Sequence, residues 1–87
     1  MGIIEMAVRR GAPIYNQGDA ASCAALYEMT AISLLQAHGD LPPQCRQALK
    51  EALIERRSVH SDDQRAWVMR HGLDRAYREM MLASSDS

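Results

Sequence analysis

Residues 11–28 have the sequence GAPIYNQGDAASCAALYE. Gly18 can adopt the left-handed conformation that ends many helices, and Asp19, directly after it, is a favoured residue at the start of a helix. Apolar and small residues recur at helical spacing on both sides of this pair. The stretch therefore predicts two helices joined by a tight turn, which together form a helical hairpin.

The helix before this turn carries its apolar and small residues on one face. That stripe consists of Ile4, Ala7, Val8, Gly11, Ile14, Tyr15 and Gly18. Pro13 interrupts it, because proline has no N–H for the carbonyl of Arg9 and its ring disfavours the helical conformation at Ala12. We therefore expect a first helix that is kinked at Pro13, or two short helices that meet near Gly11 and Ala12.

The helix after the turn is expected to be the central element, because its apolar stripe is broad. That stripe consists of Cys23, Leu26, Tyr27, Thr30, Ala31 and Leu34. Gly39 predicts the end of this helix, and Pro42 and Pro43 fit the first turn of a third helix. The third helix turns Cys45, Ala48, Leu49, Ala52 and Leu53 inward. It is expected to fray at residues 56–58.

A fourth helix is predicted to begin after Ser61. Ser61 and Gln64 have capping-box spacing, and Asp62 and Asp63 place negative charge at the positive end of the helix dipole. Its inward stripe is Ala66, Met69, Leu73, Ala76, Tyr77 and Met80. Outward ion pairs are expected between Asp74 and Arg78 and between Arg75 and Glu79. Gly72 indicates a close crossing with another helix.

These elements predict an all-α fold, a single-domain four-helix bundle of two antiparallel hairpins. The domain is expected over residues 1–83, followed by a disordered tail at 84–87. A chain of 87 residues has room for one domain with a small core. Alanine, leucine and six methionines supply most of the apolar residues, which is a composition typical of helices.

Charge and hydropathy exclude some classes of partner. The formal net charge is −1, so the chain has no excess positive charge to hold a nucleic acid. No apolar run approaches the roughly 18 residues of a membrane span, and the start of the chain lacks a secretory signal. We expect no nucleic-acid partner, no membrane insertion and a cytoplasmic location, or a periplasmic one if the chain is a segment of a longer protein with a signal.

Part of this pattern resembles the helix-turn-helix unit of tetratricopeptide proteins, in which small and aromatic residues interlock two antiparallel helices. The matching positions are Gly11, Tyr15, Gly18, Asp19, Cys23, Tyr27, Thr30 and Ala31. The resemblance covers residues 5–36. Pro13 departs from it, and residues 42–82 do not repeat it, so no stack of repeats is expected.

A longer set of short matches is similar to small uncharacterised bacterial all-helical domains. The matching strings are Gly-Ala-Pro, Tyr-Asn, Gly-Asp, Cys, Tyr-Glu, Arg-Ala-Trp and Arg-His-Gly-Leu. This resemblance covers most of the chain and implies a fold but no activity.

Cys23 and Cys45 fall on the inward stripes of consecutive helices, which are expected to bring them close together. They could form a disulfide, or they could both be small buried apolar residues, which is the more usual state in a chain without a signal peptide. The histidines at 38, 60 and 71 have no metal-ligand spacing. We therefore expect no metal and no cofactor.

No segment combines a nucleophile with its base. Glu28 beside Tyr27 is interpreted as a solvated residue, and His71 near Asp74 or Arg75 as an ordinary surface neighbourhood. A small helical domain also leaves little interior for a substrate pocket. Enzymatic activity is disfavoured, and no catalytic residue is predicted.

Trp67 and the arginines have the composition of an interface hot spot. Trp67 could equally seal the end of the bundle, with the arginines as a solvated face. The sequence favours a non-enzymatic protein-interaction module, binding a protein partner or a second copy. The predicted interaction residues are Arg10, Pro13, Tyr15, Trp67 and Arg70. The alternatives are a small-ligand or metal carrier built around Cys23, Cys45 and a histidine, and a regulatory segment of a larger enzyme.

Overall fold

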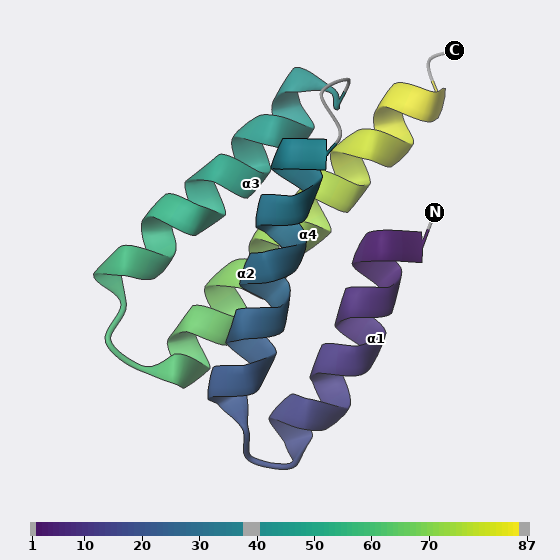
Figure 1. Ribbon diagram of the computed structural model, residues 1–87. Helices are drawn as coiled ribbons and strands as arrows, with labels where there is room; N and C mark the ends of the chain where they lie inside the picture. The colour runs from purple at the N-terminus through teal and green to yellow at the C-terminus, as the bar shows by residue number, and fades with distance from the viewer. Residues whose placement is uncertain (1, 38–40, 86–87) are drawn as a thin grey trace.

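A computed structural model describes residues 2–37 and 41–85 (Figure 1). Within these residues the chain forms four α-helices, one short 3-10 turn and no strand, which confirms the predicted all-α class. The elements are α1 (Gly2–Asn16), α2 (Ala20–Ala37), α3 (Pro43–Glu55), η1 (Arg56–Ser58) and α4 (Asp62–Ser85). No helix in this part of the chain has the length and apolar character that crossing a membrane requires.

Helices α2 and α4 form the centre of the molecule. α1 packs mainly against α2, α3 packs mainly against α4, and α2 and α4 pack against each other. In Figure 1, α1 and α2 run in opposite directions, as do α3 and α4. The more specific description, a bundle of two antiparallel hairpins, remains a prediction.

The turn between α1 and α2 has the predicted chemistry. Gly18 has a φ of 89°, in the left-handed region, where a β-carbon would be strained. The N–H of Asp19 donates to the carbonyl of Ile14 at 3.1 Å, which closes the end of α1. Asp19 Oδ1 accepts a hydrogen bond from the N–H of Ser22 at 3.1 Å and caps α2. The sequence therefore placed this turn correctly.

Helix α1 continues through Pro13 as one element, so the alternative of two short helices is wrong. Proline removes only the hydrogen bond to the carbonyl of Arg9. Tertiary packing on both sides of the proline offsets that loss, because Gly11 is buried and Ile14 packs against the core. A bend of the helix axis at Pro13 stays a prediction.

The other helix starts follow the sequence, and the ends of α3 and α4 differ from it. Pro43 begins α3, and the N–H of Gln64 donates to Ser61 Oγ at 3.1 Å at the start of α4. Residues 56–58, where fraying was expected, form η1. α4 continues to Ser85, two residues into the predicted disordered tail, and residues 86–87 lie outside the described residues, as does Gly39.

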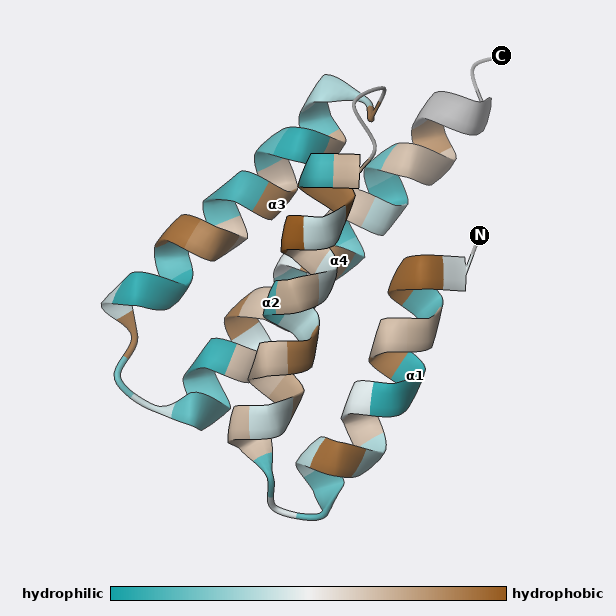
Figure 2. Ribbon diagram, in the orientation of Figure 1, coloured by the Kyte–Doolittle hydropathy of each residue, from teal (hydrophilic) through white to brown (hydrophobic). Residues whose placement is uncertain are grey.

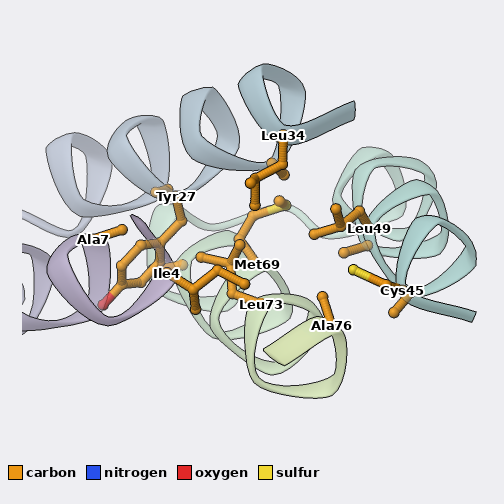
Figure 3. Close-up of a cluster of buried hydrophobic side chains, with 14 of the residues drawn as sticks. Ile4, Ala7, Tyr27, Leu34, Cys45, Leu49, Met69, Leu73 and Ala76 are labelled. Carbon is orange, nitrogen blue, oxygen red and sulfur yellow. The ribbon is translucent and has the colours of Figure 1, made fainter. Parts of the chain in front are cut away.

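The core lies between the four helices and is made of small and medium apolar side chains. Leu49, Met69 and Leu73 are its largest fully buried members. Figure 3 shows Tyr27 beside Ile4 on the α1 side of this core. Tyr27 and Leu34 are 2% and 4% exposed, which confirms both as core residues of α2. In Figure 2, hydrophilic and apolar segments alternate along the helices, as expected when each helix buries one side.

Gly11 marks the closest approach of α1 and α2. A β-carbon at Gly11 would lie 2.5 Å from the ring of Tyr27, so only glycine allows this ring to pack directly on the α1 backbone. The contact combines a small residue and an aromatic residue on two antiparallel helices. It fixes the ring of Tyr27 against α1, beside Ile4 and Ala7 in Figure 3.

Candidate functional site

A pocket of about 120 Å³ opens where the end of α1, the start of α2 and the first turns of α4 meet. The residues that line it are Ala12, Tyr15, Asn16, Cys23, Tyr27, Ala66, Trp67 and Arg70. Its walls are mostly aromatic and aliphatic. Pockets for drug-sized ligands begin at about 300 Å³, so this one has room for a single small group.

Tyr15 and Trp67 form the rim of the pocket. Their rings pack edge to face, with centroids 5.7 Å apart and planes at 71°, a geometry that aromatic pairs favour. Trp67 Nε1 donates to the Tyr15 hydroxyl at 3.0 Å, and that hydroxyl donates to Asp63. The bond to Asp63 raises the pKa of Tyr15 above its ordinary value. Trp67 is therefore held in place while 46% of it remains exposed.

Tyr27 and Arg70 form the polar side of the pocket, where Tyr27 is 2% exposed and the Arg70 side chain is 31% exposed. Burial raises the pKa of Tyr27 to about 12; the neighbouring Cys23 thiol adds to this, and a hydrogen bond from Arg70 opposes it. Tyr27 is therefore a neutral phenol at physiological pH. On its outer side, Arg70 Nε lies 3.4 Å from the carboxylate of Asp74. The guanidinium thus lies between a buried phenol and an exposed carboxylate.

The structure brings together three of the five predicted interaction residues. Tyr15, Trp67 and Arg70 all line the pocket, although they come from two helices far apart in sequence. Arg10 and Pro13 are exposed and do not line it. The reason is helical geometry. Ala12 and Asn16, which line the pocket, are four residues apart and share one face of α1, whereas Arg10 and Pro13 are three residues apart and share a different face.

The sequence did not reveal the other half of the pocket. Cys23 and Tyr27 were predicted on the apolar stripe of the second helix, and their burial confirms them as core residues. Helical periodicity marks the buried face on which Cys23 and Tyr27 lie, and it is the same whether that face borders packed side chains or a pocket. The one signal was the i, i+4 relation of Cys23 and Tyr27, which places both on one side of α2.

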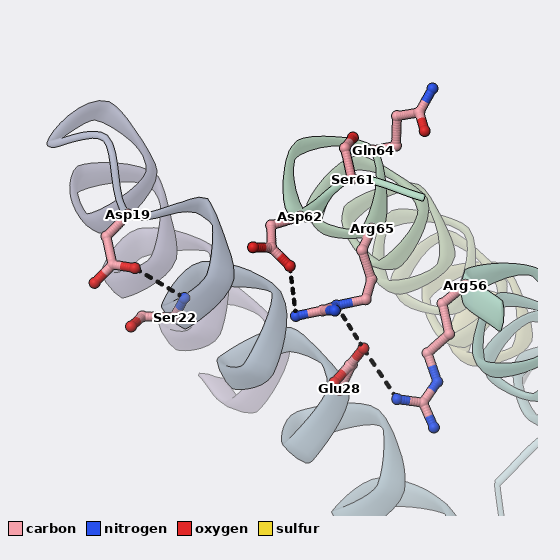
Figure 4. A network of polar contacts seen from close by, with 8 residues as sticks. All are labelled: Asp19, Ser22, Glu28, Arg56, Ser61, Asp62, Gln64 and Arg65. Atoms are coloured by element: carbon pink, nitrogen blue, oxygen red, sulfur yellow. Dashed lines mark hydrogen bonds and ion pairs between the residues drawn. The ribbon is translucent and has the colours of Figure 1, made fainter. Parts of the chain in front are cut away.

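Glu28 lies in a second polar cluster, shown in Figure 4. Its Oε2 is 3.0 Å from Arg56 Nη1 and 3.2 Å from Arg65 Nε, and its side chain is 15% exposed. Arg65 also contacts Asp62 at 3.1 Å. The interpretation of Glu28 as a solvated residue is therefore wrong. One carboxylate of α2 holds two arginines that flank the connection between α3 and α4.

A second pocket of about 110 Å³ lies between α3 and α4. Arg75 Nη1 pairs there with Glu51 Oε1 at 2.9 Å, and Asp74 pairs with Arg70. The pairs predicted within α4, Asp74 with Arg78 and Arg75 with Glu79, are therefore replaced by these partners. The cause is tertiary, because α3 lies close enough to α4 to compete for Arg75.

Both cysteines are buried free thiols. Cys23 lines the pocket together with Ala66, whereas Cys45 lies near Glu79, whose charge adds to the effect of burial in raising the pKa of the Cys45 thiol. Ala66 and Glu79 are about 20 Å apart along α4, at about 1.5 Å per residue. The two cysteines therefore lie at opposite ends of the core, contrary to the prediction that adjacent helices bring them together.

Among the described residues, no group of three histidine, cysteine, aspartate or glutamate side chains is placed to hold a metal ion. No family model matches the chain, and no curated protein or solved structure shows significant similarity to it. The candidate site is therefore the pocket and its rim, defined by its own geometry.

Proposed function

We propose that this chain is a non-enzymatic protein-interaction module that binds through Tyr15, Trp67 and Arg70. The observation that carries the proposal is the position of Trp67, which is half exposed yet fixed by Tyr15 at the edge of a pocket. Tryptophan, tyrosine and arginine are the residues most enriched at interface hot spots. A rigid indole also loses little conformational entropy when a partner covers it.

The partner that fits this surface best is a second copy of the chain. A two-fold interface needs a surface that is complementary to itself. The rim carries both signs of charge, because Arg70 lies beside Asp74 and Asp63 accepts from Tyr15. Two copies that face each other can therefore pair arginine with aspartate around the aromatic centre. Arg10 and Pro13 lie outside the centre of this surface.

The fold supports the same proposal. The direct contact of Gly11 with the ring of Tyr27 is the kind of interlocking that a tetratricopeptide-like hairpin uses, and we propose that α1 and α2 form such a hairpin within a two-hairpin bundle. In this arrangement, the pocket lies at the closed end of the hairpin. The carrier built around both cysteines has less support, because Cys23 and Cys45 lie at opposite ends of the core.

Sedimentation velocity at several protein concentrations tests the proposal. The parent chain should shift from monomer to dimer with concentration, and Trp67→Ala should remain monomeric. Met29→Ala is the matched control, because Met29 is an even more exposed apolar side chain, on α2, at 66% exposure, and it does not line the pocket. A parent that stays monomeric throughout, or a dimer that Trp67→Ala leaves intact, contradicts the proposal.

A further inference from the structure

We infer that the pocket beneath Trp67 is a receptor for a carboxylate group, supplied in the interface by an acidic side chain of the partner copy. This inference rests on the proposed function for the source of the carboxylate. The binding site itself is argued from three properties of the pocket, which are its volume, its charge and its walls.

The volume selects the size of the occupant. A space of about 120 Å³ accommodates one side chain of the size of glutamate, and it is well below the roughly 300 Å³ at which metabolite pockets begin. Trp67, which lines the pocket, is 46% exposed, so the pocket is reached from the surface of the molecule. A group that projects from another surface can therefore enter it without any movement of the helices.

The charge selects an anion. Of the described residues that line the pocket, Arg70 alone carries a charge, and Asp63 and Asp74 are not part of the lining. The pair with Asp74 is long, at 3.4 Å, and the Asp74 side chain is 47% exposed, so water competes strongly for it. A guanidinium has five N–H donors, of which the pair with Asp74 uses one and the hydrogen bond to Tyr27 uses another. The remaining donors can take a carboxylate, which matches the planar fork of arginine.

The walls select a carboxylate that carries an aliphatic stem over a bare inorganic anion. Trp67, Tyr15 and Ala66 offer apolar surface to methylene groups. The Arg70 side chain is 31% exposed, and an occupant that covers it displaces water, which strengthens the attraction between opposite charges. Tyr27 remains a neutral phenol beside Arg70, so its hydroxyl adds no repulsive charge.

The chain contains one tryptophan, so intrinsic tryptophan fluorescence reports this site directly. The probes are propionate and butyrate, compared with propionamide and butyramide, which have the same shape without the charge. Sodium chloride keeps the ionic strength constant. We expect a saturable change with the acids and at least about tenfold weaker binding of the amides, because the charge-assisted bonds to Arg70 are lost.

Two variants make the test specific. Arg70→Met should remove the preference for the acid, and Arg70→Lys should retain part of it. Arg78→Met is the matched control, since Arg78 is exposed on the same helix about 12 Å further along its axis, at about 1.5 Å per residue. Circular dichroism verifies that each variant is folded. Equal binding of acids and amides, a response to chloride alone, or the same loss in both methionine variants would overturn the inference.

The experiments distinguish a failure of the proposed function from a failure of this inference. If Trp67→Ala abolishes dimerisation while no acid binds, the interface stands and the carboxylate site is wrong. If the acids bind through Arg70 but the parent chain is monomeric at every concentration, the carboxylate site stands and self-association is wrong. If both hold, butyrate should compete with the partner and shift the dimer toward the monomer.

Discussion

Gly72 of α4 lies directly against Ala52 of α3. A β-carbon on Gly72 would overlap the β-carbon of Ala52, so the two helices cross at a distance that only glycine permits. Both residues are buried, and Ala52 is 4% exposed. The close crossing that Gly72 indicated in the sequence is therefore confirmed, and Ala52 is the residue it accommodates.

Replacing Gly72 by alanine should destabilise the protein. The overlap with Ala52 forces the helices apart, and overpacking of this kind costs about 1–3 kcal/mol. Because the two β-carbons would lie well inside van der Waals contact, we expect a cost in the upper part of that range, above the roughly 1 kcal/mol that alanine gains over glycine inside a helix. Urea unfolding measures the change. The double variant Gly72→Ala, Ala52→Gly returns the missing space and should recover much of the loss, so equal stability of the single variant and the parent would show that the crossing is not tight.

Tyr27 should make the protein sensitive to alkali. The pKa of Tyr27 is about 12 in the folded chain and 10.0 ordinarily, so the unfolded state releases this proton first. The stability that the protonated Tyr27 hydroxyl contributes is fully present below pH 10, and it is lost as the pH rises from 10 toward 12. Two pH units correspond to about 3 kcal/mol.

Tyr27→Phe isolates this effect from the other tyrosines. The variant lacks the titrating hydroxyl, so its free energy of unfolding should fall less steeply with pH than that of the parent. Urea unfolding followed by circular dichroism, from neutral pH to about pH 12, measures both slopes. Identical slopes would mean that burial of Tyr27 does not hold its proton.

Glu28→Gln should destabilise the protein more than the same change at Glu51. The Glu28 side chain is 15% exposed and forms ion pairs with two arginines, so removing its charge should cost about 1–3 kcal/mol, because both guanidinium groups lose a partly buried partner of opposite charge. Glu51 pairs with Arg75 on the surface, where water screens the interaction, and its replacement should change little. Thermal and urea unfolding of the two variants provide the comparison, and an equal response would contradict the special role of Glu28.

Both thiols should react slowly in the folded protein. Cys23 and Cys45 are 1% and 0% exposed, and burial raises the pKa of the Cys45 thiol, which lowers the fraction of reactive thiolate. Thiol titration with and without denaturant measures the protection. Peptide mass spectrometry after oxidation should find both cysteines unbridged in the native monomer, whereas rapid formation of a 23–45 disulfide would place them much closer than the structure does.

Local features of the fold could be predicted from the sequence because each depends on a few neighbouring residues. The left-handed Gly18, the cap at Asp19 and the Ser61 cap of α4 belong to this group. The burial of Tyr27 and Leu34 was also predictable, because helical periodicity marks the face of a helix that turns toward a core. These features need no knowledge of which helix lies opposite.

Features that depend on the partner helix could not be predicted. In an antiparallel pair, two residues meet when they lie equally far from the segment that connects the helices. Cys23 lies in the first turn of α2, far from the connection to α3, whereas Cys45 lies two residues into α3, close to that connection. Adjacent helices therefore do not bring them together. The same limit hid the arginines around Glu28 and the open space beside Tyr27, since both depend on where α4 crosses α2.

The bonds of Glu28 have a consequence for how the chain could be reconnected. Arg56 precedes the segment between η1 and α4 and Arg65 follows it, so one carboxylate holds both ends of that segment in place. In Figure 1, the start of α1 and the end of α4 lie at the same end of the molecule. A circular permutant that opens at His60 and joins the original ends through a linker should therefore keep both new ends close to α2, because the ion pairs of Glu28 lie on either side of the cut.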